Sequence, residues 1–317
     1  MIEVTNLVKH YGDKKAVNDI SFTINDGELV GFLGPNGAGK STTMNVVTGY
    51  LSATAGSAKI NGIDILENPM EAKKHIGYLP EQPPLYMDMS VNEYLDFICD
   101  LKGVDKNRKS HVADICEQAG ITGVYKRMIK NLSKGYKQRV GLAQALIGDP
   151  EVRILDEPTV GLDPIQIVEI RNVIKVLGKQ RTVILSSHIL PEVQSICQRV
   201  LVINNGKIIA DDTPQSLSKY VEMNQKMQLR IAAPREKAEA LIRSVPEMGD
   251  VLFEGVFETD TSDFIISSKN NADVRRMLFN ICAKAGYPIL MLNPLSASLE
   301  DIFIKLTEAK TAENKEA

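Results

Sequence analysis

The chain has 317 residues, enough for roughly two domains of ~150 residues each. Its apolar content of 44% and charged content of 24% are those of an ordinary globular protein, and its net charge of −3 argues against nucleic-acid binding through bulk positive charge. The four scattered cysteines, Cys99, Cys116, Cys197 and Cys282, include no C-x-x-C pair. They predict buried free thiols rather than a disulfide or zinc framework.

The sequence contains no membrane-spanning or targeting pattern. No apolar run approaches the roughly 20 residues that cross a bilayer. The first residues, Met1-Ile2-Glu3-Val4, lack the basic and then apolar design of a signal peptide. We therefore expect a cytoplasmic protein that reaches a membrane only through a partner.

The first segments of the chain alternate apolar and polar residues, as half-buried strands do. This pattern covers residues 2–8 and 17–24, with Tyr11 in a polar loop between them. The turn Asp26-Gly27 then leads into an apolar run, Leu29 to Leu33, which predicts a buried strand.

A glycine-rich loop follows this strand: Gly34-Pro35-Asn36-Gly37-Ala38-Gly39-Lys40-Ser41-Thr42. It opens a helix predicted over Lys40 to Tyr50, and so satisfies G-x-x-x-x-G-K-[ST] in a strand–loop–helix context. The glycines let successive N–H groups point at a polyphosphate, and the helix N-terminus favours the anion. Lys40 would reach the β- and γ-phosphates and Ser41 would ligate Mg²⁺. This phosphate loop predicts a nucleoside triphosphate site.

Between the phosphate loop and residue 150, short strands give way to helices. Asn61-Gly62 forms the turn of a hairpin within Ala58 to Ile65. A strand at Ile76–Leu79 leads into the loop Pro80-Glu81-Gln82-Pro83-Pro84. Apolar spacing and terminal glycines predict helices at residues 91–102, 109–119 and 136–147.

Two short apolar runs, Val152–Leu155 and Thr182–Leu185, flank a helical stretch at residues 164–178. This β–α–β alternation predicts a parallel sheet covered on both faces. A hairpin follows at residues 199–210 and turns at Asn204-Asn205-Gly206.

Two carboxylates, Asp156 and Glu157, end the first of these apolar runs. An aspartate at a strand's end is suited to hold Mg²⁺, and the glutamate after it to polarise a water for attack on the γ-phosphate. Asp-Glu after a strand is also a common solvated turn. The phosphate loop earlier in the chain favours the hydrolytic interpretation.

The segment Leu132-Ser133-Lys134-Gly135-Tyr136 distinguishes between families of ATPases. With it, the chain resembles the ATP-binding subunits of ATP-binding-cassette (ABC) transporters, whose signature is usually Leu-Ser-Gly-Gly-Gln. Here Lys134 and Tyr136 replace the first Gly and the Gln. In that family the segment opens a helix, and its Ser and N–H groups contact the γ-phosphate held by the opposite subunit.

Further motifs of that family follow in order. Gly161-Leu162-Asp163 resembles the D-loop, which lies across the dimer interface, and Ser187-His188 resembles the switch histidine, whose ring bonds the γ-phosphate. Tyr11 resembles the aromatic residue that stacks on adenine. The family's Mg²⁺-ligating Gln, which also relays motion to the membrane subunit, aligns with Glu81, and Gln82 comes one residue later. Either residue is a candidate for that role.

The resemblance covers about residues 1–220 and implies an α/β fold. The fold has a parallel-sheet core, an antiparallel β subdomain and a helical subdomain at about residues 88–150. Catalysis is implied for Lys40, Glu157 and His188, and Mg²⁺ binding for Ser41, Asp156 and Glu81 or Gln82. The ATP-binding residues implied are Tyr11, the phosphate loop and, in a dimer, Ser133, Lys134, Gly135 and Asp163.

The function implied is that of an ATP-hydrolysing subunit, peripheral on the cytoplasmic face of the membrane. It dimerises head to tail with a second copy, or a similar subunit, to power export through a separate permease. The Ser-Lys-Gly form of the signature and the ending Ser298-Leu299-Glu300-Asp301-Ile302-Phe303 resemble the branch of drug, sodium and gliding-motility exporters. The permease would contact the groove near residues 80–100, whose apolar residues are alternatively helical-subdomain core.

Two other functions are less consistent with the sequence. Soluble ABC ATPases that act on nucleic acid or ribosomes usually carry two cassettes, coiled-coil insertions or zinc insertions, and this chain has one cassette, no cysteine cluster and an acidic balance. A regulator that binds ATP without hydrolysing it would not need both Asp156 and Glu157.

The composition changes at residues 221–226, where a second domain begins. Beyond them the predicted order is βαββαβ, the split ferredoxin-like arrangement. The strands are predicted at 227–233, 250–257, 263–268 and 288–293, and the helices at 235–244 and 272–285. We expect an accessory α+β domain over 221–309 that binds an effector or mediates dimer contacts. A further helix is predicted at 297–308 and a polar tail at 310–317.

Overall fold

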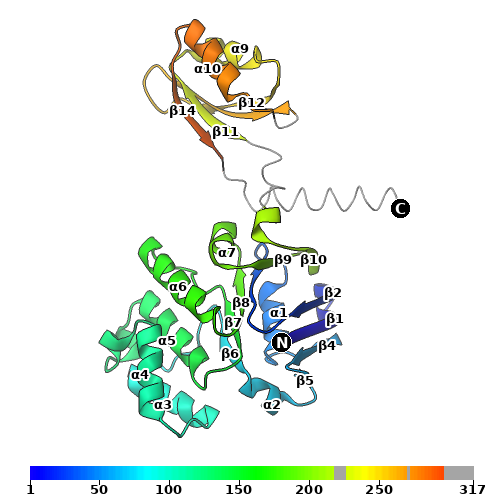
Figure 1. Ribbon diagram of the computed structural model, residues 1–317, viewed down its shortest axis with the longest axis vertical. Coiled ribbons are helices and arrows are strands. Elements are labelled where there is room, and N and C mark those ends of the chain that lie inside the picture. Colours follow the sequence, from blue (N-terminus) through cyan, green and yellow to red (C-terminus); the bar gives the residue numbers. More distant parts are fainter. Residues whose placement is uncertain (218–225, 270–271, 296–317) are drawn as a thin grey trace. The chain divides into compact units, whose positions relative to one another are not determined.

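The computed structural model describes residues 1–217, 226–269 and 272–295 (Figure 1). It divides into two compact units, Met1–Pro214 and Gln215–Ala317. The predicted boundary at 220/221, the helix at 297–308 and the tail at 310–317 lie outside the described residues. Within the described part of the chain, no helix is both long enough and apolar enough to cross a membrane.

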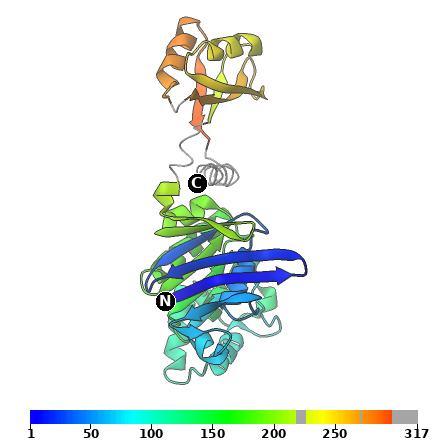
Figure 2. The same cartoon turned by 90° about the vertical axis from the view of Figure 1, so that its right-hand side faces the viewer.

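An antiparallel sheet of four strands begins the first unit, in the order β2-β1-β4-β5. The strands are β1 (Ile2–Tyr11), β2 (Lys14–Ile24), β4 (Ala55–Ile60) and β5 (Ile63–Asp64). The first two form a long hairpin, dark blue in Figure 2, in which Tyr11 pairs with Lys14. Tyr11 is therefore the last residue of a strand and not part of a loop as predicted. The strands extend further than the sequence indicates because Gly12, with φ +56°, allows a tight turn.

A second sheet of six strands has the order β10-β9-β3-β8-β7-β6. Its strands are β3 (Leu29–Leu33), β6 (Ile76–Leu79), β7 (Val152–Asp156), β8 (Thr182–Ser187), β9 (Arg199–Asn204) and β10 (Lys207–Asp212). The strands from β9 to β6 run parallel, and β10 pairs with β9 as an antiparallel hairpin. This confirms the predicted parallel sheet.

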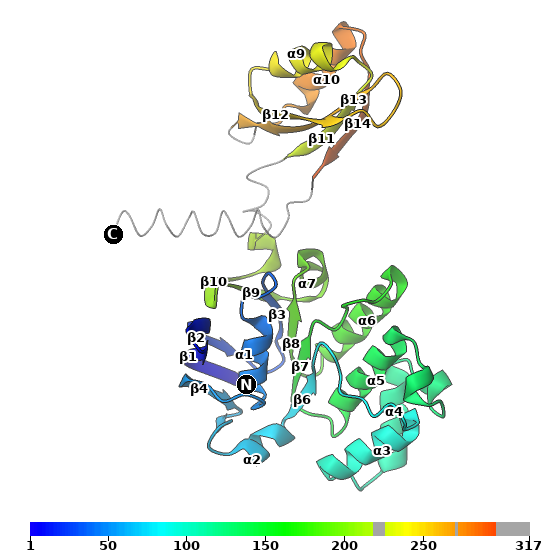
Figure 3. The same ribbon diagram turned by 180° about the vertical axis from the view of Figure 1, so that it is seen from behind.

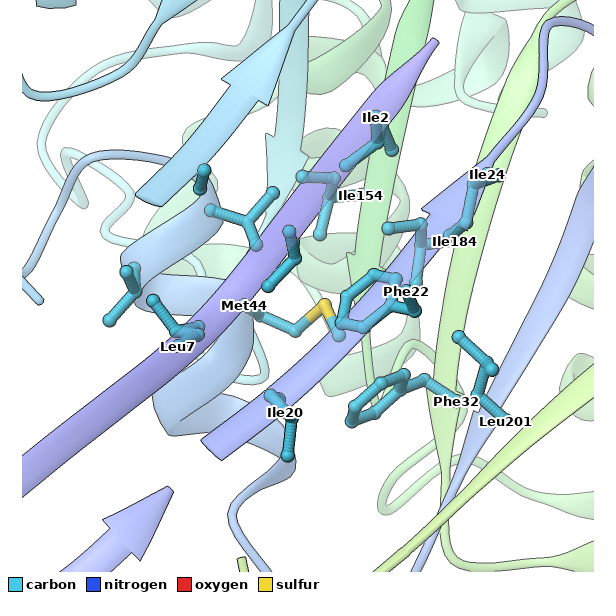
Figure 4. Close-up of a cluster of buried hydrophobic side chains, with 14 of the residues drawn as sticks. Ile2, Leu7, Ile20, Phe22, Ile24, Phe32, Met44, Ile154, Ile184 and Leu201 are labelled. Carbon is cyan, nitrogen blue, oxygen red and sulfur yellow. The ribbon is translucent and has the colours of Figure 1, made fainter. Parts of the chain in front are cut away.

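The core of the first unit lies between these two sheets (Figure 4). The helix that follows the phosphate loop, α1 (Lys40–Val47), contributes Met44 to it. The rings of Phe22 from β2 and Phe32 from β3 lie 5.8 Å apart between centroids. Because apolar residues of β1, β2, β7, β8 and β9 complete the cluster, the phosphate loop is anchored at both ends by buried structure.

Helices surround the parallel sheet and form a subdomain in which α3, α4 and α5 gather together (Figure 3). The helices after α1 are α2 (Pro69–Lys74), α3 (Val91–Lys102), α4 (Arg108–Gln118), α5 (Lys134–Leu146), α6 (Pro164–Leu177) and α7 (Leu190–Ile196). Helix α5 begins two residues earlier than predicted because Ser133 caps it, its Oγ accepting from Tyr136 N at 3.4 Å. Helix α1 ends before the predicted Tyr50 because Gly49 has φ +67°.

The second unit contains a four-stranded antiparallel sheet in the order β12-β13-β11-β14. Its elements are β11 (Met227–Ile231), α9 (Arg235–Arg243), β12 (Met248–Gly255), β13 (Ser262–Ser268), α10 (Arg275–Lys284) and β14 (Ile289–Pro294). The predicted βαββαβ order is confirmed. Buried residues of both helices, such as Ile242 and Leu278, join Phe264 of β13 in one cluster, so this unit has a core of its own.

Candidate nucleotide-binding site

One cavity of about 590 Å³ gathers most of the predicted site. The predicted residues that line it are Tyr11, Asn36, Gly37, Gly39, Lys40, Ser41, Thr42, Glu81, Glu157 and His188. Gly34, Pro35 and Ala38 belong to the same phosphate loop but do not line the cavity. Lys14, Ala16 and Val160 also line it and were not predicted. Lys14 reaches the cavity because it pairs with Tyr11 in the hairpin, and no sequence motif marks Lys14 as a site residue.

The phosphate loop folds around the ammonium of Lys40. This group donates hydrogen bonds to the carbonyls of Gly34, at 2.7 Å, and Pro35, at 3.2 Å. Gly39 precedes α1 with φ +110°, and a Cβ on it would come within 2.5 Å of the Ala16 carbonyl oxygen. Only glycine fits there, which is why the loop turns tightly enough to present its N–H groups to a phosphate.

Glu157 joins the two other residues predicted to be catalytic. Its Oε1 lies 3.2 Å from Lys40 Nζ, and its Oε2 lies 2.8 Å from His188 Nδ1. Its backbone has φ +49°, in the left-handed region that few non-glycine residues adopt. Lys40 and Glu157 are both 5% exposed, whereas the His188 side chain is 38% exposed, so a buried ion pair joins a partly exposed imidazole.

Asp156 has the features of a metal ligand. It is 2% exposed, and its Oδ1 has no hydrogen-bond partner in the part of the chain that the structure describes. Burial raises the pKa of Asp156, and the nearby Ser186 and Ser41 hydroxyls and the Lys40 charge only partly offset this. A buried carboxylate oxygen without a donor, close to a serine hydroxyl, suits a Mg²⁺ ion that takes its other ligands from phosphates and water.

A second cavity of about 700 Å³ shares lining residues with the first. The alternative Mg²⁺ ligands Glu81 and Gln82 differ in which of the two cavities they line. Ser41 and Glu81 line both cavities, whereas Asp156 and Gln82 line only the larger one. Among the described residues, no group of three or more His, Cys, Asp or Glu side chains is arranged to hold a metal ion by itself. A metal here would therefore depend on the phosphates.

The predicted signature residues do not line the nucleotide cavity of their own chain. Ser133 caps α5, and the Lys134 side chain packs against Gly161, where a Cβ would come within 1.8 Å of its Nζ. Asp163 caps α6, its Oδ1 accepting from Gln166 N at 2.9 Å. The side chain of Gln166 in turn fills the space beside Gly135. Signature segment and D-loop segment thus contact each other within one copy.

The sequence and fold match ATP-binding proteins of ABC transporters. A family model described as ABC transporter matches residues 17–160. The uncharacterized ABC transporter ATP-binding protein YxlF of Bacillus subtilis is 32% identical over 314 residues, which are 98% of this chain and 100% of the relative. The bacitracin transport ATP-binding protein BcrA of Bacillus licheniformis is 33% identical over 308 residues, 96% of this chain and 97% of the relative. The chain belongs to the ABC transporter family.

Solved structures agree with this assignment of the ABC subunit. The structure of an ATP-binding subunit of an ABC transporter has 28% sequence identity and a TM-score of 0.64, and the match covers 69% of this chain and 92% of that subunit. A dimeric bacterial ABC transporter cassette has 25% sequence identity and a TM-score of 0.63, and the match covers 68% of this chain and 99% of the cassette. The chain is therefore the ATP-binding and ATP-hydrolysing subunit of an ABC transporter, on an α/β cassette fold. The relatives named above align over both units, whereas these solved cassettes cover about two thirds of the chain.

Proposed function

We propose that two copies of this subunit close head to tail and bind each ATP between Gly34–Thr42 of one copy and Ser133–Gly135 of the other. The nucleotide cavity of a single copy contains the phosphate loop, Glu157 and His188 but not the signature residues, which supports a site completed by a partner. One of the solved cassettes is itself described as dimeric. Asp163 would lie at the same interface, because it accepts a hydrogen bond from Gln166 N and the Gln166 side chain lies beside Gly135 of the signature segment.

In this dimer Glu157 polarises the attacking water and His188 orients it toward the γ-phosphate. The 2.8 Å contact between their side chains is the observation that carries the proposal, because it places base and orienting group within hydrogen-bond distance. Lys40 neutralises the β- and γ-phosphates. Tyr11, which is 48% exposed at the edge of the cavity, stacks on adenine.

Mg²⁺ would be held by Ser41, Asp156 and Glu81 and would neutralise charge on the phosphates. Glu81 is preferred over Gln82 because Glu81, like Ser41, lines both the cavity that contains the phosphate loop and the larger cavity that contains Asp156. Gln82 lines only the larger cavity, where it is placed to relay motion instead.

The larger cavity is the proposed contact with the permease on the cytoplasmic face of the membrane. Its walls include the apolar residues Ile76, Pro84 and Ile98. Tyr86 is 53% exposed, although its ring packs against Phe97 at 5.4 Å between centroids. It therefore serves the helical subdomain and still presents a face to a partner.

The direction of transport and the domain roles complete the proposal. Relatives named for bacitracin transport and linearmycin resistance favour export. Residues 1–220 would form the ATPase domain, with its helical subdomain at about 88–150. Residues 221–309 would form an accessory domain that stabilises the dimer.

The test is whether the Glu157→Gln variant dimerises when ATP is added. Its molar mass is measured by size-exclusion chromatography with multi-angle light scattering. We expect a monomer without nucleotide and a dimer with ATP and Mg²⁺. Adding Ser133→Glu, which places a negative charge where the partner's γ-phosphate would lie, should keep the variant monomeric. A Glu157→Gln protein that saturates with ATP and stays monomeric, alone and with its permease, would contradict the proposal.

A further inference from the structure

Glu192, on α7, is a buried carboxylate that the proposed reaction does not use. The residue is 5% exposed. Its Oε2 accepts hydrogen bonds from Thr159 Oγ1 at 2.9 Å and from Ser187 Oγ at 3.1 Å. These two hydroxyls belong to chain segments that follow or end different strands, β7 and β8. The carboxylate therefore joins two segments that are distant in sequence.

Both segments carry a residue of the hydrolytic site. Thr159 comes two residues after Glu157, and Ser187 directly precedes His188. Ser187 Oγ also accepts from Ile189 N at 3.0 Å, so the turn that contains the histidine is fixed on both sides of it. Glu157 and His188 contact each other directly, and Glu192 closes a second connection behind them.

This second connection supports a strained backbone. A non-glycine residue in the left-handed region, as Glu157 is, has an unfavourable backbone conformation that persists only when its surroundings hold it. The turn hydrogen bonds Glu157 N to Ser186 O, at 3.1 Å, and Val160 N to Glu157 O, at 3.2 Å, fix the backbone. Thr159, held by Glu192, fixes the segment that leaves it.

We propose that Glu192 is a positioning residue for ATP hydrolysis. It holds the Glu157 and His188 segments at the separation at which their side chains meet, and it touches neither nucleotide nor water. This inference rests on the roles given to Glu157 and His188 under the proposed function. A displacement of about 1 Å in such a pair costs ~100-fold in rate. In the described part of the chain, the Glu192 side chain is hydrogen-bonded to Thr159 and Ser187 and to no residue of the phosphate loop.

The experiment compares steady-state ATP hydrolysis and equilibrium binding of a fluorescent ATP analogue. For Glu192→Ala we expect kcat to fall about tenfold or more, with analogue affinity and KM within about twofold of wild type. Glu192→Gln keeps an acceptor oxygen for both hydroxyls and should retain most of the activity. Thr159→Val should lower kcat and Thr159→Ser should restore it. The double variant Thr159→Val/Glu192→Ala should be no slower than Glu192→Ala, because both changes remove one connection.

Controls separate this inference from the proposed function. Ser195→Ala removes only a hydrogen bond to the Glu192 backbone carbonyl on the same helix and should behave as wild type. If Glu192→Ala does not fold, the two Thr159 variants carry the test. Unchanged kcat in folded Glu192→Ala and Thr159→Val, or a loss of analogue binding equal to the loss of kcat, would overturn the inference. Wild-type turnover in Glu157→Gln would instead overturn the proposed function.

Discussion

The ammonium of Lys40 and the carboxylate of Glu157 form an ion pair at 3.2 Å, with both residues 5% exposed. Glu157 Oε1 has no hydrogen-bond partner among the described residues, so the contact is electrostatic and lacks hydrogen-bond geometry. The same ammonium donates to the carbonyls of Gly34 and Pro35. Under the proposed function, ATP phosphates would compete with Glu157 for Lys40, and phosphate binding would release the carboxylate for the water.

Replacing Lys40 with Ala should abolish ATP binding and also destabilise the protein without nucleotide. The variant leaves Glu157 as a buried charge without its cation, which should lower the free energy of unfolding by about 1–3 kcal/mol. The double variant Lys40→Ala/Glu157→Gln should regain most of that stability in urea denaturation. If the double variant is no more stable than Lys40→Ala, the Lys40–Glu157 ion pair does not contribute to the stability of the fold.

Glu157→Gln should bind ATP as tightly as wild type and hydrolyse it about 100-fold more slowly, or slower still. The amide can still accept from the imidazole of His188, but it cannot take a proton from water. Phosphate release and analogue binding are measured side by side. Glu67→Gln, an exposed carboxylate outside the cavity, is the control that should leave both unchanged.

Tyr11→Ala should raise the Kd for ATP about tenfold, because stacking on a base contributes about 1–3 kcal/mol. Tyr11→Phe keeps the aromatic face and should bind like wild type. Inorganic triphosphate offers no base, so its affinity should be the same in all three proteins. Equal ATP affinity in Tyr11→Ala and wild type would remove Tyr11 from the site.

Asp149 gives the stability of the protein a pH dependence. Burial opposes ionisation, but the hydrogen bond and charge of Arg181, and then those of Arg153, hold the pKa of Asp149 below its usual value of 3.8. A carboxyl whose folded-state pKa is lowered stabilises the fold above the ordinary pKa, and this contribution is lost as pH falls through the lowered value. Asp149→Asn should therefore be less stable than wild type at pH 7. The gap should narrow below pH 3.8; a gap that stays constant in acid would contradict this assignment.

Arg153 lies inside β7 at 3% exposure, and its Nε and Nη1 have no partner among the described residues. Its Nη2 donates to Asp149 at 2.9 Å, and Asp149 also pairs with Arg181. Replacing a buried ion pair with apolar residues of similar volume is often neutral or stabilising, by about 1–4 kcal/mol. Removing Arg153 alone leaves no buried charge without a partner, because Asp149 is half-exposed and still pairs with Arg181. Arg153→Leu should have a Tm equal to or above that of wild type by differential scanning calorimetry. A Tm well below wild type would show that the guanidinium stabilises the strand.

Local sequence patterns predicted the elements whose turns and caps are encoded within a few residues. Asn61-Gly62 and Asn205-Gly206 adopt positive φ in the hairpins where they were expected. The pattern failed for the hairpin at Tyr11, because polar residues fill both strands near its end and the alternation disappears. The parallel pairing of β7 with β8 followed from the β–α–β order.

Local sequence patterns could not predict which residues of different strands and helices contact one another. Lys40 meets Glu157 because β3, β8 and β7 are neighbours in the sheet, although they are far apart in sequence. Glu192 follows a predicted strand in an ordinary helical segment, and only the packing of α7 against β8 reveals its two hydroxyl partners. Motifs predicted the candidate reacting groups, and the tertiary structure shows which residues contact them.

The left-handed backbone of Glu157 sets catalysis against thermostability. Glycine or asparagine adopts φ near +49° with less strain, so either would relax this turn while removing the carboxylate. A library screened for heat resistance alone would drift toward those residues and lose turnover. If Glu157 is the base of hydrolysis, as proposed, the subunit keeps a locally unfavourable conformation at a position where relaxing the backbone would remove that base.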